Sequence, residues 1–231
     1  MKVSIIIPVY NERETVEELI SRVKKVNLGM VKKEIIIVDD FSTDGSREIL
    51  KKVRGIKLFF HDKNQGKGAS LKTGIEKSTG DIILVQDADL EYSPEDYNSL
   101  IKPIIEEKTK VVYGSRILKK ENRQGRWWFY LGGRGVTFFT NCLFGSRLTD
   151  EPTCYKVFHK DLKPILVEAK GKRFEWEPEI TAKIIRKGHK IHETPISYNP
   201  RGKNKGKKIG FKDGIQTVWV LLKWRFKKIN N

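Results

Sequence analysis

The sequence predicts a single α/β domain built on a mostly parallel sheet. Short apolar runs, typical of strands buried on both faces, recur in the first half of the chain at residues 4–9, 34–38, 56–60 and 81–86. Between them lie segments with helical apolar spacing, helix-capping turns or a glycine-rich helix entry, at residues 14–26, 46–53 and 66–77. This alternation implies a parallel sheet that is covered by helices on both faces.

The second half of the sequence is less regular. Residues 111–116 resemble another strand end, 178–187 a helix and 191–198 a further strand. The polar, basic stretch 119–126 and the Gly/Lys-rich stretch 200–210 are expected to be loops. Residues 211–228 predict a final helix that is basic and amphipathic. We therefore divide the chain into a main domain over 1–200 and a basic loop with this helix over 201–231.

Composition and charge narrow the possible partners. The 231 residues are 38% apolar, enough for one sizeable core, and carry a formal net charge of +17. Ten Lys or Arg and one acid lie between Arg201 and Asn231, so +9 of this surplus is at the C-terminal end. Such a surplus favours nucleic acid, phosphorylated ligands or an acidic lipid surface.

The cysteine count and the apolar runs indicate where the protein works. Two cysteines cannot form a disulfide framework, and their spacing fits no zinc pattern, so we expect a reducing cytosol. The N-terminal apolar stretch is too short for a signal peptide, and no run of about 18 apolar residues predicts a transmembrane helix.

Polar residues follow three of the predicted strands: Tyr10–Glu12, Asp39–Asp40 and Asp87–Asp89. Ligands of open parallel sheets bind beyond the carboxyl ends of the strands. Carboxylates gathered there suit Mg²⁺ or Mn²⁺, which take one or two carboxylates together with substrate phosphate oxygens. Helix capping and solvated turns are the plainer explanation of the same acids.

Four segments carry a family resemblance through their order and spacing: Ser4–Glu12, Ile37–Gly45, Asn64–Ala69 and Asp87–Leu90. Together they resemble the family-2 glycosyltransferases closely over residues 1–120. Gly114–Arg116, Pro152–Phe158 and Pro195–Tyr198 extend the resemblance more loosely to about residue 200. Within the family the chain looks most like the dolichol-phosphate mannose synthases and related polyprenyl-phosphate hexosyltransferases. The resemblance implies a Rossmann-like nucleotide-sugar-binding domain of the GT-A type.

The resemblance also implies roles for individual residues. The nucleotide-sugar donor would be bound by Pro8, Tyr10, Glu12, Val38, Asp40, Lys67, Asp87, Ala88 and Arg116. A Mg²⁺ or Mn²⁺ ion would be held by Asp87, Asp89 and Glu91. The acceptor phosphate would be bound by Arg134, Arg201 and Lys207, and the catalytic residues would be Asp89, Arg201 and Lys207.

Plainer alternatives exist for several of these residues. Val38 suits the core, and Arg116 suits a surface charge. The glycines on either side of Lys67 can serve a tight turn without any ligand.

The sequence departs from the family pattern in three places. Phe41 stands where many relatives have glycine, and Cys154-Tyr155 replaces the commoner Ser-Gly. Gly133 replaces a serine before Arg134, and Phe129 replaces a basic residue for which Arg123 or Arg126 could stand in. Phe41 affects the expected shape of the turn after the paired acids, and the changes at Gly133 and Phe129 affect the expected acceptor pocket.

The expected reaction is metal-dependent transfer of a hexose, mannose or glucose, from a GDP- or UDP-sugar to a polyprenyl (dolichyl) phosphate, with inversion. A sugar hydroxyl needs a general base, whereas a phosphate monoester, with a second pKa near ~6, is already a nucleophile. The acceptor site then needs positive charge, which Arg201 and Lys207 supply from a glycine-rich loop able to act as a lid. A saccharide or protein hydroxyl is the alternative acceptor.

The final helix interleaves aromatic and basic residues, which suits either a lipid headgroup interface or packing on the core. We expect peripheral contact with the cytoplasmic face of an anionic membrane, which is compatible with a membrane-anchored protein partner. Nucleic acid is not expected, because carboxylates at the strand ends would repel its phosphates. A sugar-nucleotide pyrophosphorylase would open with a Gly-rich, Arg-containing loop, which this chain lacks.

Overall fold

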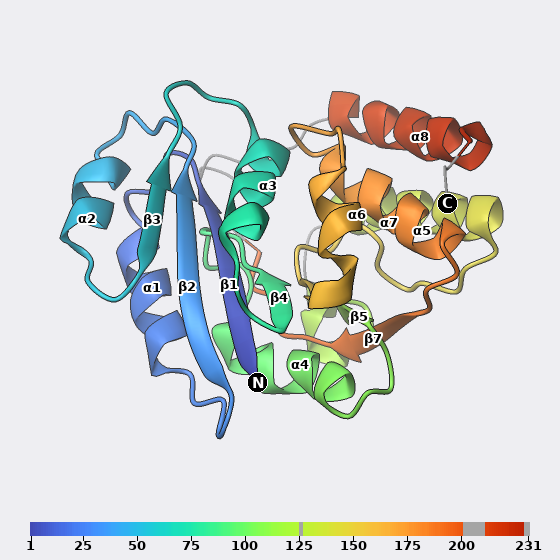
Figure 1. Cartoon of the computed structure of the whole chain (residues 1–231). Helices are drawn as coiled ribbons and strands as arrows, with labels where there is room; N and C mark the ends of the chain where they lie inside the picture. Colours follow the sequence, from blue (N-terminus) through green and yellow to red (C-terminus); the bar gives the residue numbers. More distant parts are fainter. Residues whose placement is uncertain (125–126, 201–210, 229–231) are drawn as a thin grey trace.

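A computed structural model describes residues 1–124, 127–200 and 211–228. Within them the chain forms a seven-stranded sheet in the order β3-β2-β1-β4-β6-β5-β7 (Figure 1). The strands are β1 (Lys2–Val9), β2 (Lys32–Asp39), β3 (Lys57–Phe60), β4 (Ile82–Val85), β5 (Val111–Ser115), β6 (Lys156–His159) and β7 (Ile191–Pro195). Only β6 in this sheet runs antiparallel to its neighbours, β4 and β5. The mostly parallel sheet is therefore confirmed, and β6 is a strand that the sequence did not predict.

The described helices are α1 (Val16–Lys25), α2 (Ser46–Lys52), α3 (Lys67–Lys77), α4 (Tyr97–Ile105), α5 (Trp127–Phe144), α6 (Lys163–Val167), α7 (Trp176–Arg186) and α8 (Phe211–Phe226). Short 3-10 turns occupy Pro94–Asp96, Lys120–Gln124 and Lys160–Leu162. The predicted helices α1, α2, α3 and α7 occur within a few residues of their expected bounds. Helices α4, α5 and α6 were not predicted, and the expected loop over 119–126 contains the second 3-10 turn.

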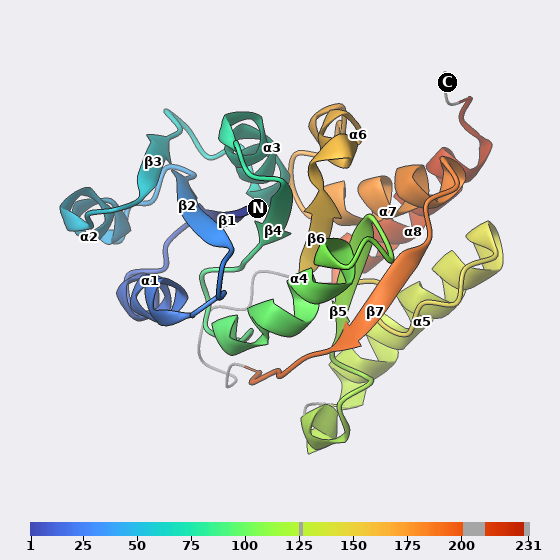
Figure 2. The same cartoon turned by 60° about the horizontal axis from the view of Figure 1, so that its bottom comes forward.

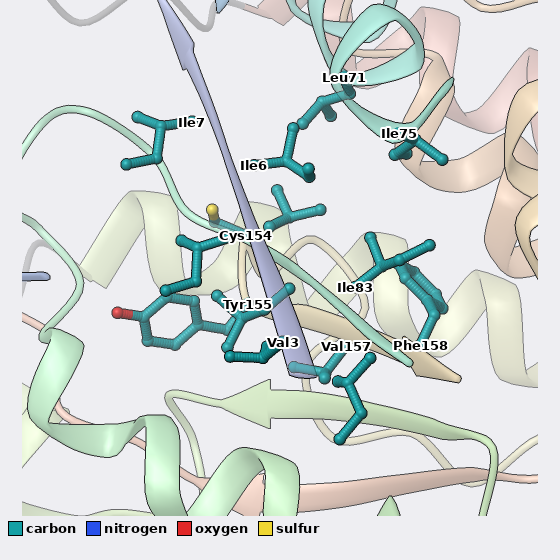
Figure 3. Close-up of a cluster of buried hydrophobic side chains, with 14 of the residues drawn as sticks. Val3, Ile6, Ile7, Leu71, Ile75, Ile83, Cys154, Tyr155, Val157 and Phe158 are labelled. Carbon is teal, nitrogen blue, oxygen red and sulfur yellow. The ribbon is translucent and has the colours of Figure 1, made fainter. Parts of the chain in front are cut away.

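The core lies around β1, whose Ile5, Ile6 and Ile7 are fully buried. Helix α3 crosses one face of this strand, and Figure 3 shows Ile6 close to Leu71 and Ile75 of that helix. A strand buried on both faces must be apolar at consecutive positions, which explains the uninterrupted isoleucine run.

The position of β1 creates the crevice in which ligands of such sheets bind. β1 pairs with β2 on one side and with β4 on the other, so the order of the strands reverses between β1 and β4. The loops that follow β1 and β4 therefore diverge at their carboxyl ends, the usual ligand position in open α/β sheets. The Asp87–Asp89 segment follows β4 directly at this point.

Helix α8 lies against α5 and α7 (Figures 1 and 2). Its Val220, Leu221 and Trp224 are buried in a small cluster with Ala182 of α7 and apolar residues of α5. Its Ile215, Trp219, Leu222 and Phe226 are exposed. One face of the helix thus packs on the protein and another faces outward. In the described part of the chain, no helix has both the length and the apolar character needed to cross a membrane.

Candidate active site

The ends of β1 and β2 bring several of the predicted donor-binding residues side by side. Pro8 pairs with Val38 across the two strands, and the Val38 side chain is fully buried. Tyr10 follows β1 and is 36% exposed, whereas Glu12 is buried and its backbone N–H donates to Ser46 Oγ at 3.0 Å. Tyr10 therefore has the most accessible side chain of these residues, whereas Val38 and Glu12 are buried.

The Asp40 carboxylate is buried and holds the loop that leads into α3. One oxygen lies 2.7 Å from Nδ1 of His61 and accepts the N–H of Gln65 at 2.9 Å. The other oxygen accepts the N–H of Gly66 at 2.7 Å. Asp40 thus holds residues 61–66 in place next to the crevice, and no sequence pattern indicated its partner His61.

Lys67, at the start of α3, lies between two carboxylates. Its Nζ is 2.8 Å from Oδ1 of Asp87 and 2.8 Å from Oε1 of Glu177 in α7. Burial works against the ammonium, but the charges of Asp87 and Glu177 outweigh it and raise the pKa of Lys67 well above its ordinary value. Lys67 is therefore a charged partner of the Asp-Ala-Asp segment.

The glycines beside Lys67 make a close approach between two loops. Gly66 has a φ of +98°, and a Cβ on it would lie 2.6 Å from the carbonyl oxygen of Lys172. A Cβ on Gly68 would lie 2.7 Å from Cβ of Trp176. Packing against the segment before α7 therefore requires glycine at both positions, whereas the predicted donor contact of Lys67 stays a prediction.

The Asp87–Glu91 segment forms a tight turn after β4. Leu90 has a φ of 62°, and Asp89 Oδ1 accepts the backbone N–H of Glu91 at 3.1 Å. Ala88 is buried, whereas Asp87 and Asp89 are half-buried. The carboxylate of Glu91 accepts the hydroxyl of Tyr198 at 2.9 Å. Asp87 and Asp89 thus share this turn, and the Glu91 carboxylate is bound to Tyr198, which follows β7.

The carboxylates of this turn supply part of what Mg²⁺ or Mn²⁺ needs. Among residues 1–124, 127–200 and 211–228, no three His, Cys, Asp or Glu side chains are gathered to hold an ion. One or two carboxylates completed by diphosphate oxygens are sufficient for Mg²⁺, and two half-buried aspartates at a strand end fit that requirement. Asp87, Asp89 and Glu91 stay predicted ligands, with the remaining positions left to the donor.

Arg116, predicted to contact the donor, is bound to Asp150. Its Nε and Nη2 donate to the two carboxylate oxygens of Asp150, each at 2.7 Å, and Nη2 also donates to the carbonyl of Pro152 at 3.1 Å. The Asp150 side chain is 3% exposed. In this structure the guanidinium links residues 150–152 to the end of β5 through these hydrogen bonds.

The departure at Phe41 has a structural consequence at the end of β2. Phe41 adopts a φ of 66°, the left-handed conformation that a glycine would take without cost, and its ring is 41% exposed. The guanidinium of Arg47 lies 5.3 Å from the centre of this ring and 4.9 Å from that of Phe60. Arg47 also pairs with the buried Asp39.

Of the predicted acceptor-binding residues, only Arg134 is described. It lies exposed on α5. Arg201 and Lys207 lie outside the described residues, as does Arg126, and the side chain of Arg123 is not described. Their expected roles stay predictions.

Several known proteins resemble this chain in sequence. The profile of glycosyl transferase family 2 matches residues 4–164. An uncharacterized protein of Methanocaldococcus jannaschii is 30% identical over 91% of this chain and 88% of its own. The UDP-N-acetylglucosamine–dolichyl-phosphate N-acetylglucosaminyltransferase of Methanococcus voltae is 32% identical, with 83% of each chain covered. The dolichol-phosphate mannosyltransferase of Pyrococcus furiosus is 30% identical over 97% of this chain and 64% of its own.

Solved structures share the fold at lower sequence identity. Glucosyl-3-phosphoglycerate synthase from Mycobacterium tuberculosis, in complex with uridine diphosphate, matches with a TM-score of 0.75 and 18% identity over 97% of this chain and 80% of its own. The same enzyme in complex with Mn²⁺, uridine diphosphate and phosphoglyceric acid matches with a TM-score of 0.74 and 18% identity, covering 99% of this chain and 80% of its own. The expected α/β fold of the GT-A type is thereby confirmed.

Proposed function

This chain belongs to glycosyl transferase family 2, and from that premise we propose that it transfers a hexose from a nucleotide-diphosphate sugar to a polyprenyl phosphate. The observation that carries the proposal is the position of Asp87 and Asp89. They follow β4 at the point where the strand order reverses, beside the end of β1. A donor diphosphate and a divalent cation find complementary groups at such a place.

Two further observations support the proposed acceptor, donor and cation. The Methanococcus voltae relative is a UDP-N-acetylglucosamine–dolichyl-phosphate N-acetylglucosaminyltransferase, and the Pyrococcus furiosus relative is a dolichol-phosphate mannosyltransferase. Solved structures of the same fold were determined with UDP and either Mn²⁺ or Mg²⁺. We propose a GDP- or UDP-hexose as donor, with mannose or glucose as the sugar and Mg²⁺ or Mn²⁺ as the cation.

The proposed reaction is a single displacement with inversion. An oxygen of the acceptor phosphate attacks the anomeric carbon, the bond to the donor diphosphate breaks, and the nucleoside diphosphate leaves from the opposite face. No general base is required, because the acceptor oxygen is already ionised at neutral pH. A Mg²⁺ or Mn²⁺ ion held through Asp89 would neutralise the charge that develops on the leaving diphosphate. Arg134, Arg201 and Lys207 would hold the acceptor phosphate.

The membrane contact is proposed for the outward faces of α5 and α8. Trp219 and Phe226 on α8 are 59% and 80% exposed, and Phe138 on α5 is 72% exposed. Lys223 stacks its ammonium on the Trp219 ring at 5.0 Å, an arrangement that suits a headgroup interface. We propose a catalytic domain over 1–200 and a basic loop with an interfacial helix over 201–231. The free thiols Cys142 and Cys154 agree with the cytoplasmic face.

A transfer screen tests this function. The purified protein is incubated with GDP- and UDP-hexoses and Mn²⁺, in the presence of dolichyl phosphate or of a saccharide panel. We expect one donor to yield a dolichyl-phosphate hexose whose anomeric configuration, read by NMR, is inverted. A product of retained configuration contradicts the displacement step. Transfer to the saccharides alone shows that the polyprenyl-phosphate acceptor is wrong, whereas the proposed nucleotide-sugar donor is still supported.

Two substitutions test the assigned residues within the same assay. Asp89→Ala should lower turnover by orders of magnitude, because the diphosphate loses its cation bridge, while the exposed Asp62→Ala serves as the matched control. Arg201→Ala should slow transfer at least tenfold, since one charge-assisted contact to phosphate is worth roughly 1.5–3 kcal/mol. Full activity of Asp89→Ala in excess EDTA would contradict the metal assignment.

A further inference from the structure

Asp87, in the Asp-Ala-Asp segment, is already paired with a positively charged side chain of the protein, Lys67. We propose that Lys67, held by Glu177, acts as an internal counterion of Asp87 and prevents the segment from binding a divalent cation until the donor diphosphate arrives. The inference rests on the proposed metal-dependent transfer. It adds a role for Lys67 of α3 as the counterion of Asp87, and a role for Glu177 of α7 in positioning Lys67.

The contacts leave little room for another cation at Asp87. Nζ of Lys67 is 2.8 Å from one oxygen of Asp87 and 3.0 Å from the other, so the ammonium faces both. The Glu177 carboxylate lies 2.8 Å from the same nitrogen. The side chains of Lys67, Asp87 and Glu177 are only 16%, 21% and 13% exposed. At such low exposure, water screens these charges weakly.

Two loops dock to bring these groups together. The N–H of Ala69 in the first turn of α3 donates to the carbonyl of Lys172 at 2.9 Å. Gly68 packs against Trp176, the first residue of α7, so closely that a Cβ would be 2.7 Å away. Helices α3 and α7 therefore begin side by side, and Lys67 and Glu177 face each other across this junction. The position of the ammonium is set by packing and not by a flexible surface contact.

The charge balance explains what the arrangement does. Lys67, Asp87 and Glu177 together carry a net charge of −1, where the two carboxylates alone would carry −2, so the ammonium removes one unit of the negative charge that a divalent cation would meet beside Asp87. A unit positive charge a few Å from the ion also repels it directly. A donor diphosphate supplies the missing negative charge and oxygen ligands, so cation and donor should bind together. The segment would then not hold a cation when no donor is present.

Mn²⁺ binding without any sugar transfer tests this inference. Free Mn²⁺ is measured by electron paramagnetic resonance while it is titrated into the full chain in the absence of nucleotide. We expect Lys67→Met to bind Mn²⁺ at least tenfold more tightly than wild type. Lys67→Gln, which keeps hydrogen-bond donors beside both carboxylates, should show the same gain if Lys67→Met folds poorly. Lys67→Arg should behave as wild type.

Three control proteins separate the role of Asp87 from a general charge effect. Lys63→Met removes an exposed charge from the preceding loop and should leave Mn²⁺ binding unchanged. Glu177→Gln leaves the ammonium to Asp87 alone and should not strengthen binding. The double variant Lys67→Met/Asp87→Asn should lose the gain. The proposal is overturned if folded Lys67→Met binds Mn²⁺ no more tightly than wild type, or if the double variant keeps the gain.

The same titration in the presence of UDP or GDP distinguishes this inference from the proposed function. Wild type should then bind Mn²⁺ tightly, since the nucleotide supplies the diphosphate. If wild type binds tightly with nucleotide but Lys67→Met shows no gain without it, the counterion role is wrong and the metal-dependent transfer stands. If no nucleotide promotes Mn²⁺ binding in any variant, the metal assignment fails and the counterion role fails with it.

Discussion

Removal of Arg116 should destabilise the fold more than it weakens a donor contact. The Arg116 guanidinium makes a bidentate pair with Asp150, whose side chain is 3% exposed. Arg116→Met leaves that carboxylate buried without its cation, a change that costs about 3–5 kcal/mol when one partner of a buried pair is lost. For a domain of this size each kcal/mol corresponds to roughly 2–4 °C in Tm. We therefore expect Tm to fall by roughly 6–20 °C.

Urea denaturation and donor binding, measured on the same proteins, test this reasoning. Arg116→Met/Asp150→Asn should recover part of the lost free energy of unfolding, because no uncompensated charge is then buried. Arg54→Met, at an exposed position, is the matched control. The reasoning is refuted if Arg116→Met unfolds within about 1 kcal/mol of wild type while its affinity for the donor falls steeply. Arg116 would then be a direct donor contact, as its motif position implies.

Two further predictions concern acid stability and membrane contact. Glu34 accepts hydrogen bonds from Ser4, Lys57 and Thr79; burial alone would raise its pKa, but these contacts lower it from 4.5 to about 2. At about 1.4 kcal/mol per pH unit, Glu34 contributes roughly 3 kcal/mol that is present above pH 4.5 and lost as the pH falls toward 2. Denaturation should thus show Glu34→Gln less stable than wild type at pH 7 and nearly equal to it near pH 2. Phe226→Ser and Trp219→Ser should reduce sedimentation with anionic vesicles, whereas Met30→Ser, on the 97% exposed Met30, should not; equal sedimentation of all proteins would contradict the proposed interface.

The alternation of strands and helices was predictable because it follows from local patterns. Consecutive isoleucines in β1 and β2 satisfy two buried faces at once, and Val16, Leu19 and Val23 lie at helical spacing on the buried side of α1. The acids after β1, β2 and β4 were correctly expected at one edge, because strands that run parallel end on the same side.

Two of the elements that the sequence did not predict, β6 and α5, lack such a pattern, whereas α4 has helical spacing at Tyr97, Leu100, Ile101 and Ile104 that was overlooked. Strand β6 has four residues, and its place between β4 and β5 depends on pairing with both. Helix α5 contains Gly132, Gly133 and Gly135, residues that disfavour a helix when they are considered alone. Packing against α7 and α8 supplies the missing stabilisation, and packing is not a property of the segment itself.

The partners of the site residues could not have been read from spacing either. Lys67 and Glu177 are 110 residues apart, and Arg116 and Asp150 are 34 apart. Motif resemblance identifies the residue types that a family keeps, but it does not say whether a charge faces the ligand or another side chain. His61, Glu177 and Asp150 belong to no recognised spacing, so only the fold could place them beside the crevice.

Some of the acids at the strand ends are paired with side chains of neighbouring loops, and this affects how substitutions should be interpreted. Asp39 pairs with Arg47, Asp40 with His61 and Asp87 with Lys67, so these acids hold loops in position at the carboxyl ends of the strands. A substitution at any of them would lower activity whether or not it touches the donor, because the loop geometry and the ligand contact fail together. Loss of activity alone thus cannot assign a donor-binding residue here. A residue that binds donor and does not also hold a loop should lose donor affinity with little change in the free energy of unfolding, so donor affinity and unfolding have to be measured on the same variant.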